Sequence, residues 1–205
     1  MTSASLNPSV ASLRAAFGAD IERALVSCGD TIVFVRRGRA HEILAWLKDH
    51  DAERYDLLLD LTAVEYRDRE LPLEVVYQLW SLERKSFLRV KIALDKAGPL
   101  EVDSAVDLWK GADWMEREVW DMFGVTFAGH PDLRRILMWE NYAEGHPLRK
   151  DFPLRGRFSR SEQVRRALSG ELDKHYSYEE LTIKEAAPLL PADVRQRLGP
   201  QEPGR

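Results

Sequence analysis

The charged residues between Glu116 and Pro153 are the group whose types and spacing could do chemistry. Glu116, Arg117, Glu118 and Asp121 lie close together in the chain. Two similar clusters follow: Gly-His-Pro-Asp-Leu-Arg-Arg at 129–135 and Gly-His-Pro-Leu-Arg-Lys-Asp at 145–151. Because histidine titrates near neutral pH and carboxylates exchange protons, acid–base catalysis is one interpretation of this pattern.

A structural interpretation of the two histidines is preferred. His130 and His146 each precede a proline, which restricts the residue before it to extended backbone. A histidine held in this way more often forms a hydrogen bond with nearby backbone than transfers a proton. Pro131 also suits the first position of a helix, so a single helical turn at 131–137 is predicted, with His130 as its cap.

The acidic residues also have a structural interpretation. Asp113 is predicted as a helix N-cap, and Glu116 three residues later could complete a capping box. Met115, Val119, Met122 and Phe123 form the apolar stripe of this helix, so the charged residues are predicted to point away from it. The basic residues Arg134 and Arg135, or Arg149 and Lys150, lie near enough in the sequence to donate hydrogen bonds to Glu118 and Asp121.

The chain is not expected to hold a metal or cofactor of its own. Cys28 is the single cysteine, which excludes an internal disulfide. An iron–sulfur cluster or a structural zinc normally takes four Cys or Cys/His ligands. The five histidines show no metal-ligand spacing.

Composition narrows the class further. The 205 residues are 44% hydrophobic and 31% charged, as in soluble globular proteins, with a net charge of −4. Arginines alternate with aromatic residues from Arg134 to Phe158, which could suggest RNA stacking, but interleaved acids disfavour nucleic acid. Trp and Arg are equally typical of protein interfaces. No apolar run approaches the roughly 18–20 residues of a membrane span, and no secretion signal is recognised, so a cytoplasmic chain is expected.

Periodicity predicts an α+β fold, with a small, mainly antiparallel sheet and helices on one face. Charged residues at alternate positions of 87–94 indicate a sheet with one solvent-exposed face. Residues 57–66 are predicted to form a hairpin with 73–80. The predicted helices are two pieces within 9–26, then 40–50, 104–109, 113–123 and 163–168, and the predicted strands are 31–35, 57–66, 73–80 and 87–94.

Four regions are predicted: an N-terminal helical segment (1–28), an α+β domain (29–125), an irregular partner-docking segment (126–158) and an extended C-terminal arm (159–205). The docking segment is expected to be ordered against another chain, because a long irregular backbone cannot satisfy its own hydrogen bonds. Its large apolar residues would otherwise be exposed. A segment that closed on its own domain would argue against this expectation.

The same residues carry a family resemblance. Glu116-Arg117-Glu118, Asp121-Met122-Phe123, His130, Arg134 and Ile136-Leu137, at this spacing, resemble the signature of the 30-kilodalton subunit of NADH:quinone oxidoreductase (respiratory complex I). The following GHPLRKDFP resembles the family's continuation. The resemblance covers residues 30–155.

The resemblance implies a non-catalytic, structural subunit in the peripheral arm of a membrane-bound, proton-translocating NADH:quinone oxidoreductase. It implies no cofactor on this chain, with FMN and iron–sulfur clusters in sister subunits. The implied partner is the subunit that forms the quinone cavity, on the cytoplasmic side of the inner membrane. The expected interface residues are Glu118, Asp121, His130, Pro131, Asp132, Leu133, Arg134, Arg135, Leu137, His146, Pro147, Leu148, Arg149, Lys150, Asp151, Phe152 and Pro153.

Two other classes stay open. The equivalent subunit of a related membrane-bound hydrogenase, or of an oxidoreductase that takes another electron donor, shares this module. An independent small enzyme working through His130, Asp132 and Arg134 is the more distant alternative.

Overall fold

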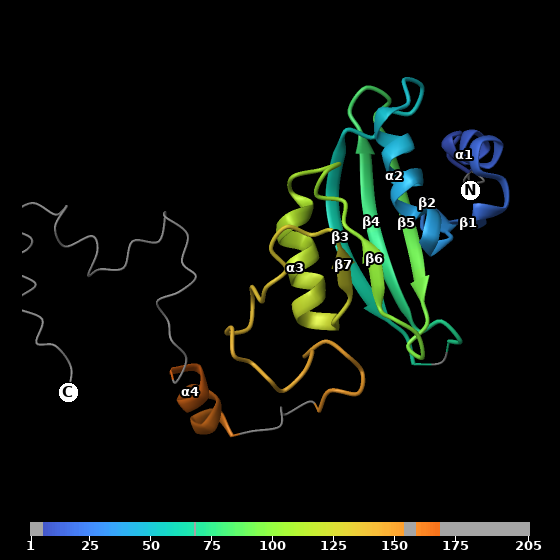
Figure 1. Ribbon diagram of the computed structural model, residues 1–205. Helices are drawn as coiled ribbons and strands as arrows, with labels where there is room; N and C mark the ends of the chain where they lie inside the picture. Colours follow the sequence, from blue (N-terminus) through green and yellow to red (C-terminus); the bar gives the residue numbers. More distant parts are fainter. Residues whose placement is uncertain (1–5, 68, 154–158, 169–205) are drawn as a thin grey trace, which may run out of the picture. The chain divides into compact units, whose positions relative to one another are not determined.

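The structure is a computed structural model that describes residues 6–67, 69–153 and 159–168. A five-stranded sheet forms its centre, in the order β1-β2-β5-β4-β3 (Figure 1). All neighbouring strands are antiparallel except β2 and β5, which confirms the mainly antiparallel sheet. The strands are β1 (Ile21–Ser27), β2 (Asp30–Val35), β3 (Leu57–Glu65), β4 (Leu73–Ser81) and β5 (Ser86–Leu94).

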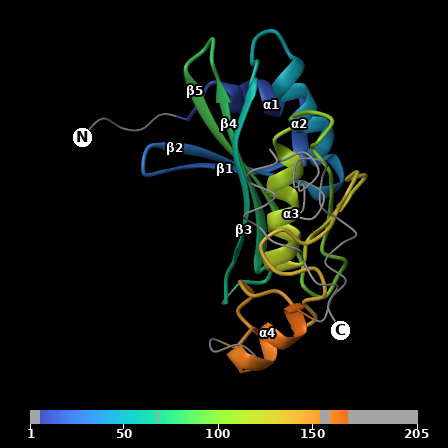
Figure 2. The same ribbon diagram turned by 90° about the vertical axis from the view of Figure 1, so that its left-hand side faces the viewer.

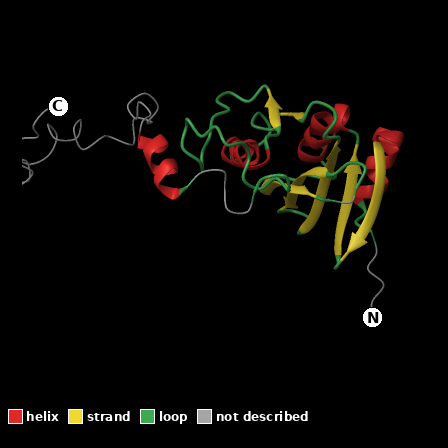
Figure 3. Ribbon diagram, turned by 90° about the horizontal axis from the view of Figure 1, so that it is seen from below, coloured by secondary structure: helices red, strands yellow, loops and turns green. Residues whose placement is uncertain are grey.

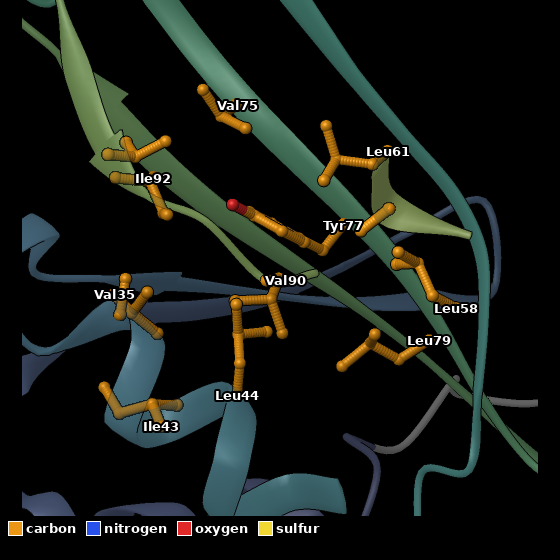
Figure 4. Packing of buried hydrophobic residues seen from close by; sticks show 14 of the residues in the cluster. Val35, Ile43, Leu44, Leu58, Leu61, Val75, Tyr77, Leu79, Val90 and Ile92 are labelled. Carbon is orange, nitrogen blue, oxygen red and sulfur yellow. The ribbon is translucent and has the colours of Figure 1, made fainter. Parts of the chain in front are cut away.

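The helices α1 (Ser9–Phe17), α2 (Ala40–Asp49) and α3 (Ala112–Phe123) lie on one face of this sheet (Figure 3). The core forms between the helices and the sheet, because alternate residues of each strand point to the face that the helices cover. Val90, Ile92 and Leu94 of β5 are buried while Arg89 and Lys91 are partly exposed, as the alternating pattern predicts. Figure 4 shows Tyr77 of β4 packed among apolar side chains that include Val75, Val90 and Ile92.

The β3–β4 hairpin is confirmed, with Glu65 opposite Leu73 beside its turn. A register shift between Leu58 and Asp60 marks a bulge in β3. The β1–β2 hairpin turns at Cys28 and Gly29, and Figure 2 shows it extending away from β3 and α3.

Two helix predictions are wrong. Residues 21–26 form strand β1 rather than a second helical piece, because pairing with β2 overrides the weak helical spacing of three apolar residues. The 104–109 stretch contains only a turn. Its backbone is instead fixed by the Ser104 N–H, which donates to Ala128 O, and by the Ala105 N–H, which donates to Glu116.

Helix α3 begins at Ala112 with Gly111 as its N-cap, and no side chain caps it, so the predicted capping box is wrong. Gly124 ends the helix in the left-handed conformation, φ 74° and ψ 27°, as predicted. The prediction that Glu116, Arg117 and Asp121 point to solvent is also wrong, because all three are buried. Each is buried beside hydrogen-bond partners that lie far away in the sequence.

The segment after α3 is not irregular from its start. Thr126–Ala128 forms strand β7, which pairs in parallel with β6 (Glu101–Asp103). Irregular backbone begins at Gly129, and no helical turn forms at 131–137. Helix α4 (Arg160–Leu168) includes the predicted helix at 163–168.

The chain divides into two compact units, Met1–Ala167 and Leu168–Arg205. Beyond residue 168, the expected C-terminal arm lies outside the described residues.

Candidate partner-docking site

The carboxylate of Asp121 organises the irregular segment. Its Oδ2 accepts three consecutive backbone N–H groups, from Ile136 (3.1 Å), Leu137 (2.8 Å) and Met138 (2.8 Å). Its Oδ1 pairs with the guanidinium of Arg135. The Asp121 side chain is fully buried, so charge-assisted hydrogen bonds replace the water that it loses. The expected acceptor role of Asp121 toward a following arginine is therefore realised within the chain. The same expectation for Glu118 is wrong, because Glu118 is exposed and accepts from no described residue.

Arg117 donates hydrogen bonds to backbone carbonyl oxygens of the same segment. Its Nε and Nη2 donate to the carbonyl oxygens of Arg134 and Arg135, at 3.2 Å each. Arg117 and Asp121 are four residues apart on α3, so they share one side of the helix. One side of α3 thus supplies both donors and acceptors to five consecutive residues of the segment.

Arg135 connects three parts of the site. Besides its pair with Asp121, it donates to Gly145 O at 3.3 Å. Its guanidinium carbon lies 5.4 Å from the ring centre of Trp120 and 5.1 Å from that of Tyr142. The planar guanidinium suits this combination of a carboxylate, a carbonyl and two aromatic rings.

The C-terminal carbonyls of α3 are capped by the second Gly-His-Pro cluster. Such carbonyls have no partner inside their own helix, and cationic donors there also suit the helix dipole. The pairs are Asp121 O with His146 Nδ1 (3.0 Å), Met122 O with the Leu148 N–H (3.0 Å) and Phe123 O with Arg149 Nε (2.7 Å). Burial lowers the pKa of His146, which favours the neutral ring.

The first cluster is fixed to the other end of α3. The His130 ring is enclosed, its Nδ1 accepts the Asp132 N–H (3.0 Å), and its Nε2 donates to Asp113 O (3.2 Å). The hydrogen bond from Arg134 lowers the pKa of the Asp132 carboxyl. Both ring nitrogens of His130 are engaged with backbone, which agrees with a structural histidine.

The second cluster also reaches the sheet. The Lys150 N–H donates to Glu65 Oε2 at 2.7 Å, and Lys96 forms an ion pair with the other oxygen of Glu65. The Glu65 side chain is buried at the end of β3. The docking segment is therefore attached to α3 at both ends and to the main sheet.

These contacts correct one premise of the sequence interpretation. Many backbone donors and acceptors of 130–150 are met within the chain, by α3, by Glu65 and by the segment itself, so the segment does not need another chain to order these parts of its backbone. Two large apolar side chains of the segment nevertheless remain uncovered: Leu137 is 59% exposed and Leu148 is 52% exposed. The exposed surface therefore consists of side chains on a backbone that contacts within the same chain hold in place.

The expected interface residues fall into two groups. The exposed ones are Glu118, Pro131, Asp132, Leu137, Leu148, Lys150, Asp151 and Pro153. The buried or partly buried ones are Asp121, His130, Leu133, Arg134, Arg135, His146, Pro147, Arg149 and Phe152. Leu133 packs against the core, so it anchors the segment inward. The buried residues fix the backbone of the segment against α3, and the exposed residues form the surface that a partner could contact.

Sequence reasoning missed Arg117 and Glu65 as site residues. Arg117 belongs to the signature given above, and its place four residues before Asp121 was the available signal. Glu65 lies far from the segment in sequence, and no local pattern relates it to Lys150. Such a long-range contact depends on how the strand and the segment meet in three dimensions.

Glu116 is a second buried carboxyl on α3, and it contacts the two residues that follow β6. Its Oε1 accepts the Ala105 N–H and its Oε2 accepts the Ser104 hydroxyl, at 2.7 Å each. Burial raises the pKa of Glu116 to about 7, and the two hydrogen bonds only partly oppose this shift. Glu116 therefore links α3 to the 104–105 turn rather than to the docking segment.

Among the described residues, no cluster of His, Cys, Asp or Glu has an arrangement that could hold a metal ion. No described helix is both long and apolar enough to cross a membrane. An open hollow is lined by His41 of α2, by residues between 103 and 110, and by Ala128, Gly129 and Pro131.

Comparisons with known proteins agree on one family. The family described as "Respiratory-chain NADH dehydrogenase, 30 Kd subunit" matches residues 33–158. A relative from Geobacter metallireducens, named as a subunit of NADH-quinone oxidoreductase, is 44% identical over 154 residues, which cover 75% of this chain and 93% of that protein. The corresponding subunit from Rhizobium etli is also 44% identical, over 68% of this chain and 73% of that protein.

Solved structures share the fold. A chain titled "Nqo5 of the trypsin-resistant fragment (1-134)" superposes with a TM-score of 0.52 at 28% identity, over 60% of this chain and 98% of that one. A chain of an archaeal membrane-bound sulfane sulfur reductase superposes with a TM-score of 0.59 over 84% of this chain and 96% of that chain, but at 20% identity it supports the fold alone. The chain therefore belongs to the 30-kilodalton subunit family of respiratory-chain NADH dehydrogenases, and is a subunit of a multi-subunit respiratory enzyme complex.

Proposed function

We propose that this chain is a non-catalytic docking subunit in the peripheral arm of an NADH:quinone oxidoreductase, on the cytoplasmic side of the membrane. Its partner is the subunit that forms the quinone cavity, and the contact is made by the segment 129–153 together with α3. FMN and the iron–sulfur clusters reside in sister subunits. The contribution to catalysis is indirect, because a rigid neighbour holds the quinone site in its working geometry.

One observation carries the proposal. The chain uses buried charges to hold an irregular segment rigidly, and that segment exposes Leu137 and Leu148. Exposed apolar side chains on a fixed backbone favour protein association, because little conformational entropy is lost on binding. The two histidines are held by backbone contacts, which disfavours an independent enzyme acting through His130.

The experiment tests docking apart from folding. The double variant Leu137→Asp and Leu148→Asp places charges at two exposed positions, so the purified chain should keep its unfolding midpoint. The membrane complex should lose this chain, and NADH:quinone turnover should fall with it. Leu82→Asp is the matched control, since Leu82 is 62% exposed on the β4–β5 turn.

Two results would count against the proposal. Normal assembly and turnover in the double variant would remove the docking role. Normal assembly with collapsed turnover would replace it by a direct part in the reaction. The other-donor alternative is tested by tagging this chain and purifying the complex in mild detergent: bound flavin with NADH oxidation supports the proposal, and a nickel-containing complex does not.

A further inference from the structure

Among the described residues, Trp114 is the largest apolar side chain near the docking segment that remains exposed. Trp114 is 62% exposed and lies in the first turn of α3, whereas Met115, Val119, Met122 and Phe123 of the same helix belong to the core or pack against it. A tryptophan buries much apolar area when it is covered and brings a hydrogen-bond donor at its edge. Tryptophan is also enriched among the few residues that carry most of the binding energy of an interface.

Trp114 is held in place by the same framework as the docking segment. The guanidinium carbon of Arg117 lies 5.2 Å from the centre of its ring. This guanidinium also donates to the carbonyls of Arg134 and Arg135. One buried side chain therefore connects Trp114 to the segment, and the ring is continuous with the proposed docking surface.

Glu118 supplies a charge beside this ring. It lies four residues after Trp114, so the two side chains are neighbours on one side of α3, with Cβ atoms about 5–6 Å apart. Glu118 is exposed, and no described residue forms an ion pair with it, although Asp121 on the same helix is fully paired. An apolar ring with an uncompensated carboxylate beside it is complementary to an apolar pocket with a cation at its rim.

We propose that Trp114 and Glu118 form a two-point anchor for a sister subunit of the complex, which presents an apolar pocket flanked by a lysine or arginine. This inference rests on the proposed docking function and names the contact that it uses. Because Arg117 already occupies one face of the ring, the partner's cation is directed to Glu118 and its apolar surface to the free face of Trp114.

The test is competitive incorporation in the natural host. A tagged variant and the untagged wild-type chain are produced together, and their ratio in the purified intact complex is measured by quantitative mass spectrometry. We expect Trp114→Ala to be under-represented by at least about 10-fold, and Trp114→Phe by less, since a phenyl ring fills part of the pocket. Leu82→Ala, with the same exposed fraction, should match the wild type.

The charge is tested separately. We expect Glu118→Lys to be under-represented by about 10-fold and Glu118→Gln by only a few-fold, because an exposed ion pair is weak whereas a charge reversal is repulsive. Glu22→Lys, at an exposed position on β1, is the control. Both Glu118 variants alter an exposed side chain, so they keep the test valid if Trp114→Ala lowers the stability of the chain.

The outcomes separate this inference from the docking function. If the Leu137→Asp and Leu148→Asp variant is excluded while Trp114→Ala and Glu118→Lys incorporate like their controls, the anchor is wrong and docking stands. If all variants incorporate equally, docking through this surface is wrong as well.

Discussion

Gly124 and His146 approach so closely that no side chain fits between them. A Cβ built on Gly124 would lie 2.5 Å from Nε2 of His146. The glycine also has φ +74°, the left-handed conformation that ends α3. Gly124 therefore ends the helix and makes room for the ring that caps it, so two separate constraints require glycine here.

Gly124→Ala should destabilise the chain by about 2–4 kcal/mol, as the sum of left-handed strain and displacement of His146. Gly129→Ala isolates the strain, because Gly129 has φ +83° and a Cβ there meets nothing within 4 Å. That control should lose only about 1–2 kcal/mol. Urea unfolding of the purified chain measures both, and equal losses would show that the approach of His146 is unimportant.

Asp121 should be the most sensitive charged position of the site. Asp121→Asn removes the charge that pairs with Arg135 and leaves a guanidinium that is only 10% exposed without its counter-ion. Breaking one partner of a buried pair typically costs about 3–5 kcal/mol. Asp132→Asn alters an exposed pair with Arg134 and should cost less than about 1 kcal/mol. Denaturant midpoints of the two variants check the contrast, and similar values would contradict the central role of Asp121.

The sheet could be predicted from the sequence because its signals are local. The alternation in β5 and the charged turn between β3 and β4 depend on neighbouring residues, and the structure places both as predicted. Strand β1 was missed because its apolar residues also fit helical spacing, and only pairing with β2 decides between the two. Local patterns specify an element when just one pairing of it buries the apolar residues.

The sequence predicted where in the chain the site lies, but not which of its residues are buried or contact one another. The sequence pointed to Asp121 and to the arginines that follow, and a pair between Asp121 and Arg135 is present. It also suggested that Glu116 and Arg117 were solvated, because charged residues on an amphipathic helix usually are. Their burial depends on partners at 104–105 and 134–135, which reach α3 only after the chain has folded. Burial of a charge is a tertiary property that no helical pattern reveals.

The two Gly-His-Pro clusters should hold their histidines in opposite tautomers. In His130 the Nδ1 atom accepts a backbone N–H, so the proton lies on Nε2. In His146 the Nδ1 atom faces the Asp121 carbonyl and must donate, so the proton lies on Nδ1. Long-range proton–nitrogen NMR of the labelled chain above pH 7 distinguishes the two forms. The same tautomer in both rings would contradict one of the two hydrogen-bond arrangements.

Glu116 should make the stability of the chain decrease as pH rises through the range from about 4.5 to about 7. Its pKa is raised from 4.5 to about 7 in the folded chain, so the native state binds a proton that the unfolded state has lost. Stability from this group is fully present below pH 4.5 and is lost as pH approaches 7. A shift of this size corresponds to about 3 kcal/mol, as an order of magnitude.

Glu116→Gln isolates this effect. The amide stays neutral, its oxygen can still accept the Ala105 N–H, and the Ser104 hydroxyl can reverse to accept from the amide nitrogen. His146, with its lowered pKa, acts in the opposite direction below about pH 6.5, but it is present in both proteins and cancels in their difference. Urea unfolding at pH 5, 6, 7 and 8 should give a difference that moves in favour of the variant as pH rises. A pH-independent difference would mean that Glu116 is already ionised in the native chain, held by its two donors despite its burial.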